Sequence, residues 1–126
     1  MIGAIGRTGL AILALGAAVS ASPAIAQTQT LSDESVRKLM MYAWQQTPPR
    51  FTKPDNTVVV IDREKPDLAF VPVEIGREIV IAARRSALAQ ICKLDEHQLA
   101  NYRSMMLREV VKKKWTEQQI VFINML

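Results

Sequence analysis

The fold is decided by residues 73–93, which read VEIGREIVIAARRSALAQICK and follow Pro72. Apolar side chains recur in this stretch at helical spacing and define one face of an α-helix: Ile79, Val80, Ala83, Ala87 and Ile91. Pro72 can begin the helix, because a proline in the first turn gives up a backbone donor that would have no helical partner. This is the longest helical segment that the sequence predicts, so we expect it to be the central helix.

Another helix is predicted before it, starting near Ser32. Ser32 is a typical N-cap residue, and the two acidic residues that follow it favour the positive end of the helix dipole. The apolar face of this helix consists of Val36, Leu39, Met40, Ala43 and Trp44. Two prolines at 48–49 end the helix, because proline lacks a backbone donor and moves the preceding residue out of the α region.

Two further helices are predicted after the central one. The sequence from Asp95 to Gln98 has the pattern of a capping box, so we expect a break and a new helix at Asp95. The inner face of that helix is predicted to contain Leu99, Tyr102, Met106 and Val110. Thr116 and Gln119 repeat the capping pattern, which predicts a short last helix reaching Leu126.

The segment between the first two helices has a different character. Residues 57–61 are β-branched throughout, which predicts a short strand. Residues 68–71 could pair with it as a β-hairpin, or the segment could form an extended arm around the helices. We therefore predict a mainly α fold, a small bundle of about four helices with a β-hairpin or extended arm inserted at about residues 50–72.

The start of the chain is typical of a secretory signal peptide. Arg7 precedes an apolar run at residues 10–19, and small residues follow at Ala24 and Ala26. A run of about ten apolar residues is too short for a membrane-spanning helix, which needs about twenty. We expect cleavage after Ala26, leaving residues 27–126 as one domain that is periplasmic or secreted and has no stable membrane insertion.

Charge and cysteine content narrow the possible partners. The chain has a net charge of +4; loss of Arg7 with the leader leaves 15 basic and 12 acidic residues. This balance, in an exported protein, does not indicate nucleic-acid binding. Cys92 is the only cysteine, so no disulfide can form within the chain. Because Cys92 follows apolar residues, we expect it to be buried as a small hydrophobic side chain.

The sequence lacks the common catalytic motifs. Gly76 is the only glycine after residue 26, which excludes phosphate-binding loops, dinucleotide fingerprints and nucleophile elbows. His97 is the only histidine, which excludes zinc motifs that need two. Cys92 and His97 could form the minimum pair for an activated thiol, but no spacing specifies a third group. We therefore expect neither enzymatic activity nor a cofactor.

The resulting hypothesis is an exported, non-enzymatic helical module that binds a protein or a cell-envelope component. One candidate surface is the strand Val58, Val59 and Val60, whose edge could pair with a partner or form a homodimer. The other is a basic cluster suited to an anionic envelope component: Arg103, Arg108, Lys112, Lys113 and Lys114. The alternative hypothesis is a small-ligand or copper carrier that uses Cys92, His97 and nearby methionines.

Overall fold

The computed structural model describes residues 31–126, so the predicted leader at residues 1–26 lies outside the described residues. The elements follow in the order α1 (Asp33–Gln46), β1 (Arg50–Thr52), β2 (Val58–Val60), the 3₁₀ helix η1 (Pro66–Leu68), α2 (Val73–Ile91), α3 (Asp95–Val111) and α4 (Glu117–Met125). This part of the chain is mainly helical, with four α-helices and a two-stranded antiparallel sheet between α1 and α2. The predicted fold class is confirmed.

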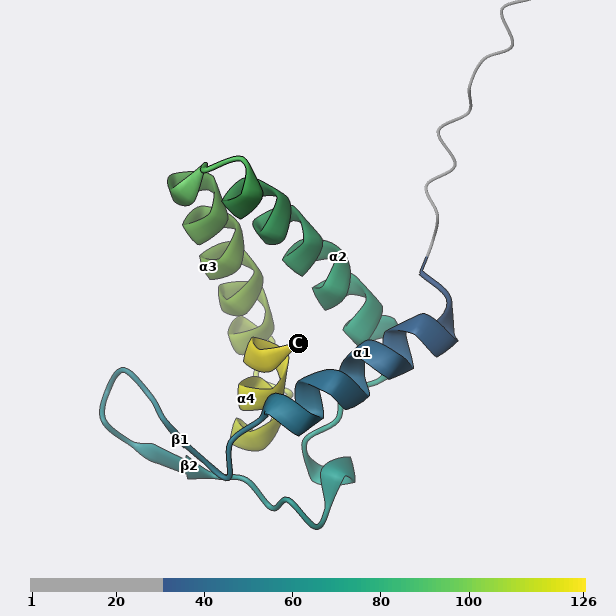
Figure 1. The fold of residues 1–126 in the computed structure, drawn as a ribbon. Coiled ribbons are helices and arrows are strands. Elements are labelled where there is room, and N and C mark those ends of the chain that lie inside the picture. Colours follow the sequence, from purple (N-terminus) through teal and green to yellow (C-terminus); the bar gives the residue numbers. More distant parts are fainter. Residues whose placement is uncertain (1–30) are drawn as a thin grey trace, which may run out of the picture.

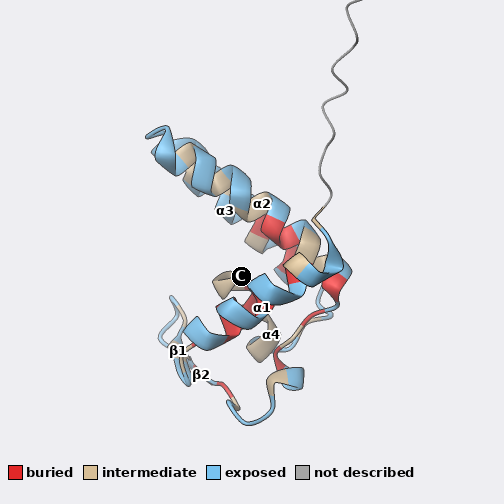
Figure 2. Cartoon of the chain, turned by 45° about the vertical axis from the view of Figure 1, so that its right-hand side comes forward, coloured by how far each residue is buried: buried red, intermediate tan, exposed pale blue. Residues whose placement is uncertain are grey.

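The two longest helices, α2 and α3, form an antiparallel hairpin (Figure 1). Helix α1 crosses α2 near the base of the hairpin, and α4 contacts α1, α3 and β2. The outer end of the hairpin extends beyond these elements and is exposed along most of its surface (Figure 2). The hydrophobic core therefore lies at the base of the hairpin.

An aromatic cluster lies at the centre of this core. Phe122 of α4 is 0% exposed, and its ring centroid lies 5.0 Å from that of Phe70. Trp44 of α1 meets Phe70 edge-on at 5.8 Å, an arrangement that aromatic quadrupoles favour. The aliphatic side chains buried in the same core include Val36, Met40, Ile61, Val71, Ile79, Val121 and Ile123.

The predicted side-chain caps are present at two of the three helix starts where the sequence predicts one. The Ser32 hydroxyl accepts a hydrogen bond from the Ser35 amide at 3.2 Å, and Thr116 and Gln119 form a complete capping box. Helix α3 does begin at Asp95, but its N-cap is Leu94 and no side chain caps it, so the predicted capping box there is wrong. The turn is closed by backbone instead: Lys93 has a φ of 57°, and the Leu94 amide donates to the Ala89 carbonyl at 2.8 Å.

The predicted strand exists, but its partner differs from the prediction. Strand β2 pairs with β1, with Phe51 opposite Val59, whereas residues 66–71 form η1 and a buried connection. A tight turn explains this choice. The Asp55 carboxylate accepts hydrogen bonds from the backbone and hydroxyl of Thr57, and Asn56 adopts a φ of 66°, which asparagine tolerates well.

Several residues predicted to be buried are exposed. Ile91 is 77% exposed and Cys92 is also exposed, because both lie at the outer end of the hairpin where no other element covers them. In α3 the buried positions are Met105 and Glu109, so the predicted inner face is wrong. Three of its residues instead remain largely exposed: Leu99, Tyr102 and Val110.

Gly76 allows α1 and α2 to approach each other closely. A Cβ atom at this position would lie 2.9 Å from Met40 Sδ and 3.3 Å from Val36 Cγ1. We therefore expect Gly76→Val to lower the free energy of unfolding by about 1–3 kcal/mol through overpacking, measured by urea denaturation. The same substitution in a Met40→Ala background should cost less, because the space is then free; strictly additive effects would contradict this explanation.

Candidate functional site

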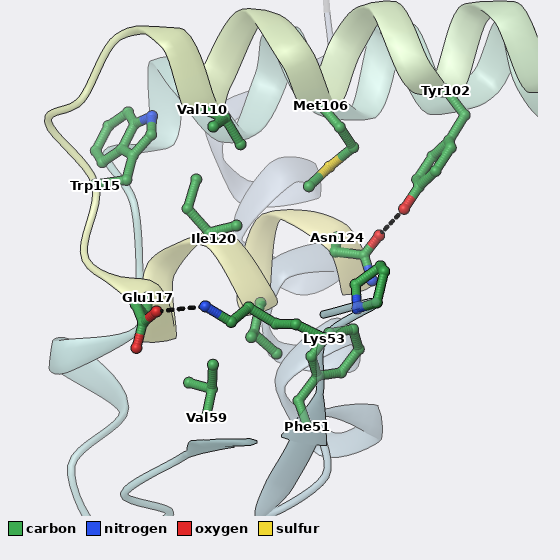
Figure 3. Close-up of a pocket in the computed structure, with 12 residues that line it drawn as sticks. Phe51, Lys53, Val59, Tyr102, Met106, Val110, Trp115, Glu117, Ile120 and Asn124 are labelled. Atoms are coloured by element: carbon green, nitrogen blue, oxygen red, sulfur yellow. Dashed lines mark hydrogen bonds and ion pairs between the residues drawn. The ribbon is translucent and has the colours of Figure 1, made fainter. Parts of the chain in front are cut away.

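An apolar groove opens between the β1–β2 ribbon and helices α3 and α4, and it has a volume of about 440 Å³ (Figure 3). The ribbon contributes Phe51 and Val59 to its wall, and α4 contributes Ile120. Trp115, in the connection between α3 and α4, lies at one end (Figure 3). A cleft of this size with an apolar lining is typical of a binding site for a small molecule or a single inserted segment.

Helix α3 supplies one side of the groove through Tyr102, Met106 and Val110. These residues are spaced by four, so they share one face of the helix. They belong to the face that the sequence predicted for the core, but the structure turns this face toward the groove. Tyr102 is 41% exposed and Val110 is 50% exposed, so an apolar face is left open to a ligand.

Two polar contacts lie along the groove. The Lys53 ammonium donates to the Glu117 carboxylate at 2.7 Å, which links the ribbon to α4 (Figure 3). This hydrogen bond raises the pKa of Lys53. The Tyr102 hydroxyl donates to the Asn124 side-chain oxygen and so links α3 to α4. Both contacts connect elements that form the walls.

The position of Trp115 is set by a buried carboxylate. Glu109 is 0% exposed and accepts hydrogen bonds from Trp115 Nε1 at 2.9 Å, Lys112 Nζ at 2.9 Å and Arg108 Nε at 3.3 Å. Burial raises the pKa of the Glu109 carboxyl, but the hydrogen bonds from Lys112, Trp115 and Arg108 outweigh burial, so the pKa lies below its ordinary value. Glu109 is therefore a charged anchor for the tryptophan.

The basic cluster is smaller than the sequence predicted. Arg108 and Lys112 are engaged with Glu109, whereas Arg103, Lys113 and Lys114 form no ion pair within residues 31–126. The Lys114 ammonium lies 4.3 Å from the centroid of the Trp115 ring, within the range of a cation–π interaction. An ammonium group without an ion-pair partner among the described residues therefore lies over Trp115, which lines one end of the groove.

The predicted strand surface is only partly available. Val59 is 4% exposed and belongs to the core, so its assignment to an interaction surface is wrong. Successive side chains of a strand point to opposite faces, so Val58 and Val60, on either side of Val59, point away from the core and are 45% and 64% exposed. The alternation of side chains along a strand accounts for the difference.

The residues proposed for a copper or thiol site do not gather into one. Cys92 and His97 are both exposed at the outer end of the hairpin. Met40 and Met105 are buried in the core at its base, and Met106 lines the groove. Residues 31–126 contain no group of three or more histidine, cysteine or acidic side chains that could hold a metal ion.

The groove is lined mainly by apolar side chains. The residues that line it in the described part of the chain include no histidine, cysteine or serine, and its one carboxylate is paired with Lys53. The sequence analysis missed Phe51, Lys53 and Glu109 as parts of this site. Glu109 had a detectable signal, since it lies four residues after Met105 and three before Lys112 and thus faces the same side of the helix as both.

Comparison with known protein families, curated proteins and solved structures gave no match to this chain. Within residues 31–126 no helix combines the length and the apolar character needed to cross a membrane.

Replacing Glu109 should change how the free energy of unfolding depends on pH. Because its pKa is lower in the folded state than the ordinary 4.5, its contribution to stability is fully present above about pH 4.5 and is lost as pH falls through the folded-state value. We expect Glu109→Gln to lower the free energy of unfolding at pH 7 by about 1–3 kcal/mol and to reduce the loss of stability in acid, both measured by denaturant titration.

The matched control is Glu117→Gln, which alters a carboxylate whose side chain is 68% exposed. Its effect at pH 7 should stay below about 1 kcal/mol, as for other exposed ion pairs. Equal losses in the two variants would show that the Glu109 cluster is not an anchor.

Proposed function

We propose that this chain is an exported, non-enzymatic helical module that binds a cell-envelope component in the apolar groove. The observation that carries the proposal is the open face of Tyr102, Met106 and Val110, which faces the ribbon across a cavity of about 440 Å³. Exposed apolar side chains on a concave surface are typical of binding sites. The lining residues in the described part of the chain are mostly apolar and their one carboxylate, Glu117, is paired with Lys53, which favours binding over catalysis.

The groove favours a small anionic amphiphile, a molecule with an apolar chain and one negatively charged group. Its walls are aliphatic and aromatic, so transfer of an apolar chain from water is favourable. Lys114 lies over the Trp115 ring, Lys113 precedes it in the chain, and neither forms an ion pair within the described residues, so this positive charge can attract an anionic group. The net positive charge of the chain supports the same ligand class.

Decanoate is a suitable test ligand. Its dissociation constant can be measured by the displacement of anilinonaphthalene sulfonate, an anionic apolar dye, from the groove. We expect Val110→Asp to weaken decanoate binding roughly tenfold or more, because it places a negative charge on an apolar wall. The matched control is Leu99→Asp, which alters another half-exposed residue of α3 that does not line the groove. Equal weakening by both variants, or no saturable binding by the unaltered protein, would disprove the assignment.

A second pair of measurements tests the role of the lysines. Replacing Lys113 and Lys114 together by glutamate should weaken decanoate binding and leave decanol binding nearly unchanged, because decanol has no charge. Loss of both ligands would instead indicate that the substitutions damage the groove.

The export part of the proposal rests on residues 1–26. We expect the protein recovered from an exporting bacterial cell to begin at Gln27, as determined by intact mass and N-terminal sequencing. Ala24→Arg should leave the leader attached, because the residues beside the cleavage point must be small. Recovery of the unaltered chain with its first residues intact would contradict export.

A further inference from the structure

The α2–α3 hairpin carries a second set of apolar side chains on its outward side. In α2, Ile81 and Leu88 are 39% and 62% exposed, and in α3, Leu107 and Val111 are each 64% exposed. Helical residues spaced by seven or by four lie on one face, so each pair forms a stripe. A helix with apolar side chains on more than one face is typical of a helix that is covered on more than one side.

The outward face of α2 differs from the faces with which α2 contacts α1 and α3. The seam between the two helices is marked by Asn101, whose amide donates to the Ala82 carbonyl at 2.8 Å and to the Ser86 hydroxyl at 2.6 Å. Gly76 and Val80 face α1. At about 100° per residue, Ile81 points away from both Val80 and Ala82. The groove also lies elsewhere, on the face of α3 that contains Met106.

Two opposite charges flank Ile81 at nearly equal distances along the helix. Glu78 precedes it by three positions and Arg85 follows it by four, and both are exposed. Neither forms an ion pair with any other residue of the described chain. They also cannot pair with each other, because seven residues span about 10.5 Å along a helix. One acidic and one basic side chain therefore flank the exposed apolar residue without a partner.

Two antiparallel copies of α2 satisfy this pattern. With a two-fold axis that passes midway between positions 81 and 82, Glu78 of one copy lies opposite Arg85 of the other, and this happens twice by symmetry. Ile81 then lies next to its own counterpart at the centre of the interface. We propose that the outward face of α2 is a homodimer interface, with a second copy of this chain as its occupant.

The oligomeric state tests the proposal. In sedimentation velocity the purified protein should be a dimer, and Ile81→Glu should raise the dissociation constant roughly tenfold or more, because it places two like charges beside the two-fold axis. Ile91→Glu is the matched control: it alters a 77% exposed residue of the same helix, on a face about 80° away, and should leave the dimer intact. Circular dichroism should report unchanged helix content for both variants.

Exchanging the charges at positions 78 and 85 tests whether the dimer depends on specific ion pairs or only on apolar contact. Glu78→Arg alone and Arg85→Glu alone each create two like-charge contacts across the axis and should weaken the dimer roughly tenfold. The double variant restores both ion pairs and should recover most of the original affinity. A monomeric unaltered protein, or a double variant as weak as the singles, would overturn the proposal. Decanoate binding is a separate measurement, because the groove does not include α2.

Discussion

Burial of the Phe122 ring is the interaction on which the rest of the structure depends. A helix of nine residues is not stable alone in water, so α4 owes its position to packing. Three consecutive side chains, Val121, Phe122 and Ile123, are each no more than 2% exposed, so more than half of the helix circumference is buried at this level. Because α4 contacts α1, α3 and β2, its docking determines where those elements lie.

The buried Glu109 carboxylate extends this control to the groove. It holds the indole of Trp115 at the point where the chain leaves α3 and approaches α4, and Thr116 then caps α4. A buried charge without partners would be costly, which explains why Lys112 and Arg108 are drawn to it. The same cluster therefore pairs two cations with a buried carboxylate and fixes one wall of the groove.

The sequence was sufficient for the number and order of the four α-helices, because these depend on local signals. Ser32 and Thr116 cap helices as their side chains predict, and Pro72 immediately precedes α2. The errors concern which face of an element is covered. The stripe through Met106 has the helical periodicity of a core face, and only the position of α4 shows that it borders a groove. Val59 was misassigned for the related reason that its partner strand was not identified.

The groove and the proposed dimer face follow from a single limitation of size. Helices α2 and α3 contain 19 and 17 residues and are roughly 28 and 25 Å long, whereas α4 contains nine and is roughly 13 Å long. The shorter helix cannot cover the longer pair, so apolar side chains beyond its reach remain exposed. Their charged neighbours then distinguish the two surfaces. The positive charge of Lys114 beside Trp115 favours an anionic ligand at that end of the groove. The opposite charges of Glu78 and Arg85 are complementary to the same two charges on an antiparallel copy of α2, which favours a second copy of the chain.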